Sequence, residues 1–433
     1  MNIRKIVKRL IPQGLFQEIE PMGHLLEAVL FNFIYGFPAR KMKVIGVTGT
    51  NGKTTTSFLI HKMLVEAGYN VGLMTTVGYG VGGDIKMQVH HMTNVPAPEF
   101  MQRLKWMKGQ GVEWLVLETT SHALAQHRVW GVPYSIAVVT NLTHEHLDYH
   151  KTFERYVAAK RSMFRLAQRN ARGRRLGIAN ADDSIAADFA HETENSMLYG
   201  VQAGDVRARD ITLRSDGISY TADTGDMTYA ISSHLPGSFN VYNTLAAVCV
   251  GRALGLDKKQ IEQGIAALSG VEGRMTSIDE GQSYSVIVDF AHTPDSFEKL
   301  FKDLRPVVKG KLIVLFGSAG RRDEAKRAIQ GELAGKYADE VIITEEDDRD
   351  IDGTQIMNQI AAGAEKAGKT RDKNLFLVHD RTEAIAFAIS RAKSADDTVL
   401  LLGKGHEKTI ERADGEHPWD EIGTARDALR NRL

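Results

Sequence analysis

The chain has 433 residues, with 54 Lys and Arg against 54 Asp and Glu, 43% hydrophobic residues and one cysteine. At about 100–200 residues per domain, this length predicts two to four domains with their own cores and excludes general disorder. A net charge of zero gives no broad positive field for a nucleic-acid backbone, so no nucleic-acid partner is expected. Cys249 cannot form an internal disulfide, which favours a reducing compartment, the cytoplasm.

The first 42 residues carry a basic start and an apolar stretch. Four basic residues lie among the first nine positions, and Leu25–Tyr35 is strongly apolar but interrupted by Glu27. This stretch is shorter than the roughly 18–20 residues that span a bilayer, so no transmembrane segment is expected. We predict a packed helix here. The alternative is that a basic, amphipathic N-terminus contacts a membrane or a partner protein.

From Met42 onward, apolar runs typical of buried strands alternate with helical spacing, as in Thr54–Ala67. The strand runs are Val44–Val47, Trp114–Leu117, Ile136–Val139 and Leu176–Ala179. Such alternation predicts a mainly parallel sheet with helices on its faces. Alternating residues and turn signals over 206–233 predict antiparallel hairpins attached to that sheet. Helices are then expected over 243–254 and 258–268.

A glycine-rich linker at Gly270–Gly273 separates this region from a second strand–helix series. Its five expected strands are 286–288, 312–315, 341–343, 375–378 and 399–402. A compact doubly wound domain accounts for such a series. The predicted class is therefore α/β, with a central phosphate-loop domain over 43–272 and a Rossmann-like C-terminal domain over 273–433. Residues 1–42 form a short N-terminal segment.

The strongest motif lies directly between a predicted strand and a predicted helix. It reads Gly49-Thr50-Asn51-Gly52-Lys53-Thr54-Thr55. Backbone N–H groups of such a loop can cradle a triphosphate, Lys53 can neutralise the β- and γ-phosphates, and the Thr54 hydroxyl can ligate Mg²⁺. The strict phosphate-loop pattern has glycine where this chain has Val47. The position between strand and helix still favours ATP binding over a purely structural turn.

Polar residues follow two of the buried strands. Glu118 ends one of them, and Asn141 follows another and leads into His144-Glu145-His146. Ligands of an open α/β sheet bind at the carboxyl ends of its strands. A carboxylate and imidazoles beside a phosphate loop therefore indicate a Mg²⁺ site. The alternative is that these histidines have loop or helix-capping roles.

Eight motifs, in the same order, resemble the Mur ligases, and among them the ligases that add the third residue of the peptidoglycan stem peptide. The motifs are Gly46–Thr56, Glu118–Arg128, Thr140–His150, Ala159-Lys160, Gly237–Asn243, Gly273–Met275, Asp289–Asp295 and Gly403–Glu407. The resemblance implies ATP-dependent amide-bond synthesis, in which a phosphorylated carboxylate is attacked by the amine of an incoming amino acid. It implies UDP-N-acetylmuramoyl-L-Ala-D-Glu as the acceptor and meso-diaminopimelate as the amine.

The resemblance also assigns roles to single residues. The implied catalytic residues are Lys53, Glu118, His146 and Lys160. The implied metal ligands are Thr54, Glu118, His146 and Lys160, the last as a carbamate that turns a cation into an anionic ligand. Further nucleotide contacts are implied for Asn243, Arg274, Asp289 and His292. Helix capping is the alternative role for Asn243.

Substrate positions follow in the same way. The implied acceptor contacts are Thr93, Asn94, Thr120, Gln126 and Arg128. The implied amine contacts are Arg322, Arg349, Gly403 and Glu407. A guanidinium suits the distal carboxylate of diaminopimelate, and Glu407 can accept from its ammonium. The family's Asp-Asn-Pro-Arg signature reads Glu-Asp-Asp-Arg at 346–349, and Arg349 has a surface ion pair as its alternative role.

Members of the family carry an N-terminal domain that grips the UDP moiety, whereas about 42 residues precede the phosphate-loop domain here. Three explanations of this difference are open. Either another subunit supplies uridine recognition, or the enzyme binds its acceptor mainly through the central domain, or the acceptor is a different carboxylate. Two competing hypotheses remain: a related ligase that forms polyglutamate or another poly-amino acid, and a non-catalytic ATP-binding subunit. The non-catalytic subunit is disfavoured by the retention of Lys53, Thr54, Glu118, His146 and Lys160. The expected partners are small molecules, and the expected state is a monomer.

Overall fold

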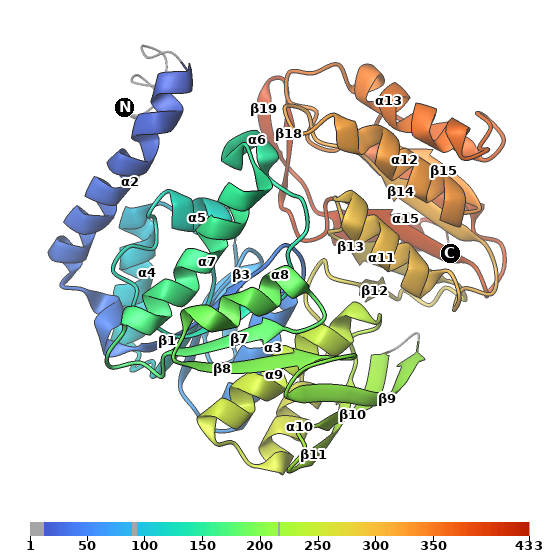
Figure 1. The fold of residues 1–433 in the computed structure, drawn as a ribbon. Helices are drawn as coiled ribbons and strands as arrows, with labels where there is room; N and C mark the ends of the chain where they lie inside the picture. Colours follow the sequence, from blue (N-terminus) through green and yellow to red (C-terminus); the bar gives the residue numbers. More distant parts are fainter. Residues whose placement is uncertain (1–12, 89–92, 215–216, 433) are drawn as a thin grey trace. The chain divides into compact units, whose positions relative to one another are not determined.

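The computed structural model describes residues 13–88, 93–214 and 217–432, and these form two compact units. The first unit combines the residues up to Asp210 with Tyr220–Ile231 and Tyr242–Ala267. The second combines Ile211–Ser219 and Ser232–Val241 with the residues from Leu268 onward. Both units contain strands and helices, so the predicted α/β class is confirmed (Figure 1). The four basic residues near the start of the chain lie outside the described residues.

A large, mainly parallel sheet forms the centre of the first unit. Its strands are β1 (Lys43–Thr48), β2 (Val71–Met74), β3 (Gly78–Val81), β4 (Asp84–Met87), β5 (Trp114–Glu118), β6 (Tyr134–Val139), β7 (Leu176–Asn180) and β8 (Asn195–Gly200). The sheet continues with β9 (Val206–Arg214), β10 (Gly217–Asp223) and β11 (Thr228–Ser233), in the order β11-β10-β9-β8-β7-β6-β1-β5-β2-β3-β4. In this order, all neighbouring strands from β9 through β8, β7, β6, β1 and β5 to β2 are parallel. Strands β3 and β4 add an antiparallel edge next to β2. The four strands predicted over 44–179 are confirmed, and glycines hide β2 and β3 from a search for unbroken apolar runs.

Helices cover this sheet. They are α2 (Gln13–Tyr35), η1 (Pro38–Lys41), α3 (Lys53–Glu66), α4 (Ala97–Gly109), α5 (Ser121–Ala125), α6 (Leu147–His150), α7 (Phe153–Arg169), α8 (Ser184–Ala187), η2 (Asp188–Glu192), α9 (Phe239–Leu254) and α10 (Lys258–Ala266). Local chemistry fixes several starts: the Thr152 side chain caps α7, and Asp257 with Gln260 forms a capping box on α10. The helices predicted for the α3, α9 and α10 regions are confirmed.

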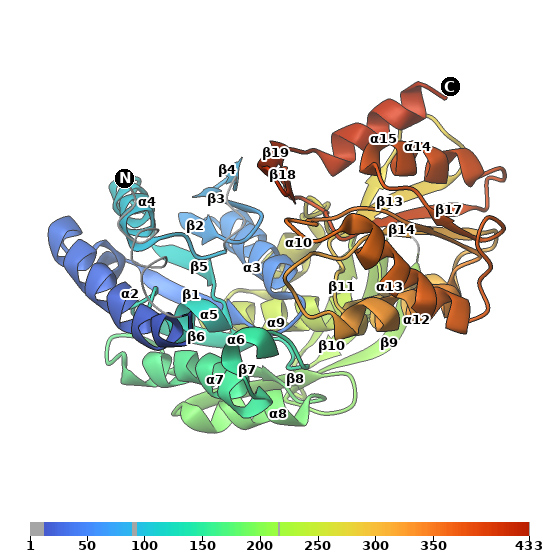
Figure 2. The same ribbon diagram turned by 90° about the horizontal axis from the view of Figure 1, so that it is seen from above.

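Helix α2 contains the predicted helix of residues 25–35, but it is packed on one face only. His24, Ala28 and Asn32 are buried, and α2 lies beside α4 (Figures 1 and 2). The opposite face exposes Leu26 by 64% and Phe33 by 67%. The prediction of a packed helix is therefore confirmed for one face of α2 and not for the opposite face. Across residues 13–88, 93–214 and 217–432, no helix has both the length and the apolar character needed to cross a membrane.

The second unit has a six-stranded sheet in the order β12-β13-β17-β14-β15-β16. Its strands are β12 (Thr276–Ile278), β13 (Ser285–Asp289), β14 (Leu312–Phe316), β15 (Glu340–Ile343), β16 (Leu375–Leu377) and β17 (Thr398–Leu402). All neighbours are parallel except β12. The helices are α11 (Pro294–Leu304), α12 (Ala325–Tyr337), α13 (Gly353–Lys366), α14 (Arg381–Arg391) and α15 (Glu421–Arg430). The five predicted strands are confirmed, and a hairpin of β18 (Thr409–Arg412) and β19 (Gly415–Pro418) was not predicted.

Candidate active site

The loop between β1 and α3 depends on two glycines. Gly49 and Gly52 have φ angles of 141° and 82°, which favour glycine. A Cβ atom on Gly49 would lie 1.9 Å from Thr140 Oγ1, and one on Gly52 would lie 2.3 Å from Asn243 Oδ1. Val47, by contrast, lies inside β1 in register with Glu118 and is buried, so the departure from the strict pattern falls on the strand and not on the loop.

Asn141, just beyond β6, holds the loop in place. Its backbone oxygen accepts from Thr50 N at 2.8 Å, and its side chain both accepts from Asn51 N at 3.0 Å and donates to Asn51 O at 3.1 Å. The Thr50 hydroxyl is bonded to the Tyr156 hydroxyl of α7 at 2.8 Å. The segment after β6 and the helix α7 therefore fix the loop that the sequence assigns to phosphate binding.

Two lysines reach backbone carbonyls of this loop. Lys53 Nζ donates to Thr50 O at 2.6 Å, and Lys160 Nζ donates to Gly49 O. Lys160 is only 2% exposed, and burial, together with the charge of Lys53, holds its pKa well below the ordinary lysine value. Glu145 and Glu118 oppose that shift without cancelling it. The surroundings of Lys160 thus disfavour its charged form.

Glu118 lies at the carboxyl end of β5 and is 1% exposed. Its Oε2 accepts from Thr54 Oγ1 and from Thr76 N, both at 3.0 Å, and its Oε1 accepts from Thr76 Oγ1 at 3.1 Å. The hydroxyl and carboxylate predicted to hold Mg²⁺ therefore lie together. Thr76 orients the carboxylate, and sequence reasoning missed it because β2, the strand that precedes it, was not predicted.

The histidines that follow β6 separate into two groups. His144 stacks on Phe153 at 4.3 Å between ring centroids, and His150 is hydrogen-bonded to Ser121 Oγ at 3.0 Å, so packing roles describe these two. His146 has a φ of 57°, and its ring lies 4.7 Å from His122 and 6.3 Å from Tyr156. His146 thus lies near Tyr156, the residue whose hydroxyl is bonded to Thr50 of the phosphate loop.

These donors suit a hard cation, because carboxylate and hydroxyl oxygens are what Mg²⁺ prefers. Among the described residues, no group of three or more His, Cys, Asp and Glu side chains is placed to hold a metal. The predicted ligand set supplies one carboxylate, from Glu118, and one imidazole, from His146.

Three of the predicted acceptor residues lie together next to Glu118. Asn94 Nδ2 donates to Glu118 O at 2.9 Å, and Asn94 Oδ1 accepts from Thr120 N and Oγ1, both at 3.1 Å. Thr93 Oγ1 is bonded to Thr76 Oγ1 at 2.7 Å. The other two, Gln126 and Arg128, follow α5, and Gln126 Nε2 donates to Glu20 Oε2 of α2 at 3.5 Å.

Asn243 is the predicted adenine-side residue of the first unit. It lies in the second turn of α9, so it does not cap that helix. Its Oδ1 accepts from Thr56 Oγ1 at 3.2 Å. This bond places the amide directly against the start of α3, beside Gly52.

The predicted nucleotide residues of the second unit gather around Phe290. The Arg274 guanidinium lies 4.7 Å from the centre of its ring, and the His292 ring lies 4.7 Å away. Asp289 accepts from the backbone N–H groups of Met275 and Ala291, both at 2.8 Å, while burial raises its pKa and Arg274 opposes that rise. The three residues therefore form one cluster at the carboxyl end of β13.

The predicted amine contacts are drawn into a network of ion pairs. Lys404, fully buried, donates to Asp347 Oδ1 at 2.9 Å and to Glu407 Oε2 at 2.6 Å. Arg349 Nε donates to Glu411 Oε2 of β18 at 2.7 Å. These pairs bring Arg349 and Glu407 into one region, to which the missed residues Lys404 and Glu411 also belong.

The other two predicted amine contacts differ from each other. Gly403 has a φ of 102°, and a Cβ atom there would lie 2.6 Å from Glu346 Oε2, so glycine allows the acidic loop to approach. Arg322 lies exposed in the loop after β14. The alternative role of Arg349 is a surface ion pair. Arg349 does pair with Glu411, but its side chain is only 18% exposed.

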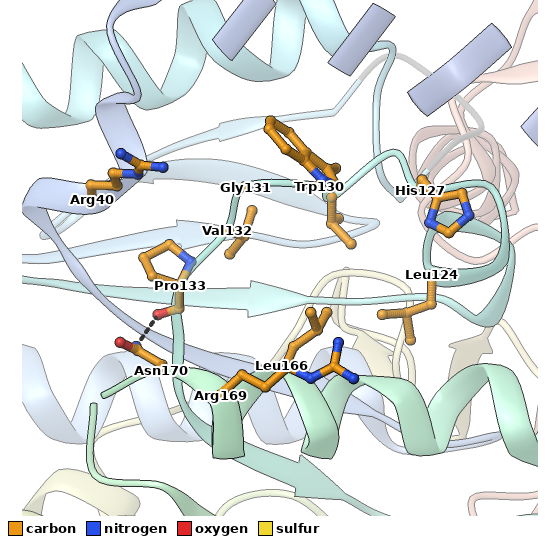
Figure 3. A pocket seen from close by; sticks show the side chains of 11 residues that line it. Arg40, Leu124, His127, Trp130, Gly131, Val132, Pro133, Leu166, Arg169 and Asn170 are labelled. Carbon is orange, nitrogen blue, oxygen red and sulfur yellow. Dashed lines mark hydrogen bonds between the residues drawn. The ribbon is translucent and has the colours of Figure 1, made fainter. Parts of the chain in front are cut away.

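A separate pocket of about 370 Å³ lies between the segment after α5 and α7 (Figure 3). Its lining includes Arg40, His127, Trp130 and Arg169. None of the residues predicted to bind phosphate or metal lines this pocket. It is therefore distinct from the candidate active site.

A phosphate loop, a carboxylate and a buried lysine at one edge of a parallel sheet define a nucleotide-dependent enzyme. The Mur ligase middle domain matches residues 47–251, and the Mur ligase, glutamate ligase domain, matches residues 273–405. The chain is 41% identical over 421 residues to the UDP-N-acetylmuramyl-tripeptide synthetase of Roseiflexus sp. (strain RS-1), covering 94% of this chain and 82% of the relative.

Two further matches agree with this one. The UDP-N-acetylmuramoyl-L-alanyl-D-glutamate--2,6-diaminopimelate ligase of Bacillus cereus is 38% identical over 410 residues, covering 94% of this chain and 82% of the relative. A solved structure of a ligase of that name has a TM-score of 0.61 at 30% identity, over 90% of this chain and 79% of that one.

The chain therefore belongs to the Mur ligase family. It is an ATP-dependent ligase that joins an amino acid to a carboxylate in the synthesis of peptidoglycan precursors. The matches favour this activity over a polyglutamate-forming enzyme and over a non-catalytic subunit.

Proposed function

We propose that the enzyme joins meso-diaminopimelate to UDP-N-acetylmuramoyl-L-Ala-D-Glu. The observation that carries the chemistry is the placement of Thr54, Glu118 and Lys160 around the loop of Gly49–Thr55. The names of the relatives support the acceptor and the amine, because they specify the muramoyl dipeptide and 2,6-diaminopimelate.

The residues of the first unit account for the first half-reaction. The loop N–H groups and Lys53 bind the triphosphate, and Lys53 exchanges its contact with Thr50 O for phosphate oxygens. The acceptor carboxylate attacks the γ-phosphorus; the bond from that phosphorus to the bridging oxygen breaks, and ADP leaves. The amine then attacks the acyl phosphate, loses a proton and displaces inorganic phosphate. Closely placed cationic and N–H groups stabilise the charge that both steps concentrate here.

Thr54, Glu118 and His146 would hold Mg²⁺, with Lys160 as a carbamate. Bound Mg²⁺ would neutralise phosphate charge. The lowered pKa of Lys160 supports the modification, because the neutral amine is the form that adds to CO₂: an N–C bond forms and one proton is released. The carbamate would place an anionic group, able to ligate Mg²⁺ with Glu118, where burial and Lys53 disfavour a cation.

For the amine substrate, we propose that Arg349 binds the distal carboxylate and Glu407 the ammonium group. Both side chains already hold ion-pair partners, Glu411 and Lys404. Substrate binding therefore exchanges one charge-assisted bond for another, and specificity comes from the geometry of the exchange. We further propose that Arg322 contacts the same amino-acid substrate.

The organisation of the chain is proposed as a short segment over 1–42, a central ATP-binding domain over 43–272 and an amino-acid-binding domain over 273–433. Thr93, Asn94, Thr120, Gln126 and Arg128 bind the acceptor in the central domain. Asn243, Arg274, Asp289 and His292 bind the nucleotide. The enzyme acts as a monomer in the cytoplasm, where ATP and a reduced Cys249 are both expected.

The test is release of ADP by the purified chain with ATP, Mg²⁺, an acceptor and an amine, each omitted in turn. We expect turnover to require all four, and to be highest with the UDP-muramoyl dipeptide and meso-diaminopimelate in a panel that includes L-lysine and the muramoyl dipeptide without UDP. Equal turnover with and without UDP on the acceptor would contradict the proposed acceptor. A clear preference for lysine would contradict the proposed amine and leave the acceptor standing.

A further inference from the structure

Helix α2 has a continuous exposed apolar face. Of the eleven large hydrophobic side chains that the described part of the chain exposes, six lie on this helix. They are Ile19 (43%), Met22 (59%), Leu26 (64%), Leu30 (56%), Phe33 (67%) and Ile34 (62%). Five of them recur at intervals of three or four residues, which places them on one side of a helix. We call these six residues the α2 stripe.

The opposite face of α2 is occupied by its own protein. His24, Ala28 and Asn32 are buried, and Asn32 Nδ2 donates to Trp130 O at 3.0 Å. Two acidic residues of the helix flank this buried side: Glu20 and Glu27 each lie 3.8 Å from a His24 ring nitrogen. The packed face fixes the helix on the first unit, so the α2 stripe faces away from the core.

Basic residues lie at the C-terminal end of the α2 stripe. The Phe33 ring packs edge-on against Phe37 at 5.1 Å, and the Arg40 guanidinium lies 3.9 Å from the centre of the Phe37 ring. Arg40 and Lys41 are both exposed. Arg40 also lines the pocket of Figure 3, into which Arg169 brings a second guanidinium. Positive charge therefore follows the apolar face at Arg40 and Lys41.

The sequence places positive charge before α2 as well. Residues 1–12 contain Arg4, Lys5, Lys8 and Arg9 and no acidic residue. A zero net charge over the whole chain makes this clustering a local property. An apolar helix face followed by basic residues, and preceded by more of them in the sequence, suits a surface that offers hydrocarbon and negative charge together, as an anionic bilayer does.

We propose that the α2 stripe and its basic flanks bind the surface of a membrane containing anionic lipids. The apolar side chains enter the boundary between head groups and acyl chains, and Arg40 and Lys41 contact lipid phosphates. The α2 stripe contains none of the proposed catalytic residues, so binding to lipid holds the ligase at the membrane without using them.

The test is co-sedimentation of the full chain with vesicles of phosphatidylcholine, with and without phosphatidylglycerol. We expect binding only when the anionic lipid is present, and a decrease in binding as salt is raised. The stripe variant Leu26→Glu/Phe33→Glu should lose at least about tenfold in partitioning. The matched control Val307→Glu/Ile329→Glu changes two exposed apolar residues of the second unit and should bind as the wild type does.

The charge variant Arg40→Gln/Lys41→Gln should lose about tenfold or more in partitioning to anionic vesicles, at about 1 kcal/mol for each basic residue near the surface. Every variant should keep its ADP release in the absence of vesicles, which shows that it is folded. Absence of vesicle binding by the wild type would overturn the proposal, whatever the substrate tests show. So would a wild-type dimer in sedimentation velocity that the stripe variant converts to a monomer without affecting lipid binding, because a second copy would then cover the stripe.

Discussion

The two units give their lysines different partners. Around the phosphate loop, Lys53 and Lys160 donate to the backbone carbonyls of Thr50 and Gly49. In the second unit, Lys404 is paired with the carboxylates of Asp347 and Glu407. Buried Arg381 is likewise paired with buried Glu421, at 2.7 and 2.9 Å.

The difference reflects whether the lysines of each region are to bind a charged ligand. A carbonyl is a weak partner for an ammonium group, so Lys53 can turn from Thr50 O to phosphate at little cost. The buried ion pairs of the second unit already neutralise one another, and removing one member leaves a charge without compensation. The first region is thus prepared for charged ligands, whereas the second obtains its shape from its own charges.

The largest expected effect is at Lys160. Lys160→Ala should reduce ADP release by about 10³-fold or more, because it removes a group beside the transferred phosphate. A short-chain carboxylic acid should partly restore the rate by replacing the carbamate. Lys259→Ala, which changes an exposed lysine of α10, is the control and should be unaffected. An unrescued Lys160→Ala enzyme with full activity would show that the buried lysine is not needed.

Glu118 tests whether the loop region depends on an added cation. Glu118→Gln keeps the shape of the side chain and removes its charge, so the Mg²⁺ concentration for half-maximal rate should rise about 10- to 100-fold. Glu113→Gln is the matched control, since it changes an exposed residue next to the amino end of the same strand, β5. An unchanged Mg²⁺ dependence in Glu118→Gln would remove this carboxylate from the metal site.

Stability in acid tests the second region. Burial, and then the charge of Arg274, lowers the pKa of His406 to about 3. Below the ordinary histidine pKa, the unfolded chain therefore binds a proton at His406 that the folded chain does not bind. The free energy of unfolding is highest above that pKa and decreases as the pH falls toward 3. The loss from this group between pH 7 and pH 5 should be about 2 kcal/mol.

Denaturant unfolding of the wild type and His406→Leu at both pH values measures this loss. His61 of α3, whose pKa burial lowers to about 4, adds a loss of the same sign to both proteins, and it cancels in the comparison. Equal pH dependence in the two proteins would mean that His406 is not held neutral in the folded state.

The smallest expected effect is at the amine subsite. Arg349→Lys keeps the charge but removes the fork that pairs with a carboxylate, so the KM for meso-diaminopimelate should rise about tenfold while the KM for ATP stays constant. Arg321→Lys is the control, because Arg321 is 65% exposed and pairs with Asp350. A rise in both KM values would indicate that Arg349 supports the fold of the second unit instead.

Much of this fold could be read from local sequence. Unbroken apolar runs such as 312–315 form strands in the observed places, since a parallel strand buried on both faces leaves a continuous signal. Strands β2 and β3 were missed because Gly72, Gly78 and Gly80 break that signal. The hairpin of β18 and β19 was missed because its residues are mainly polar, as in Thr409–Arg412.

The candidate site shows the same division. Lys53, Thr54 and Glu118 carry chemistry in residue type and in spacing from a strand, so the sequence points to them. Thr76 has no such signal, because its role arises from a hydrogen bond to a residue 42 positions away. Lys404 lies in a recognised motif, but its burial between Asp347 and Glu407 is visible only in the structure.

By itself, the sequence of this protein determined the α/β class, the phosphate loop and membership of the Mur ligases, because each depends on residues close together in the chain. Only the tertiary structure decided which charges meet and which surfaces remain open. It brought Lys160 to the carbonyl of Gly49, and it turned Leu26 and Phe33 of α2 toward solvent while burying Asn32. The physical reason is that burial and pairing depend on distant elements, while backbone conformation and motif chemistry are set locally.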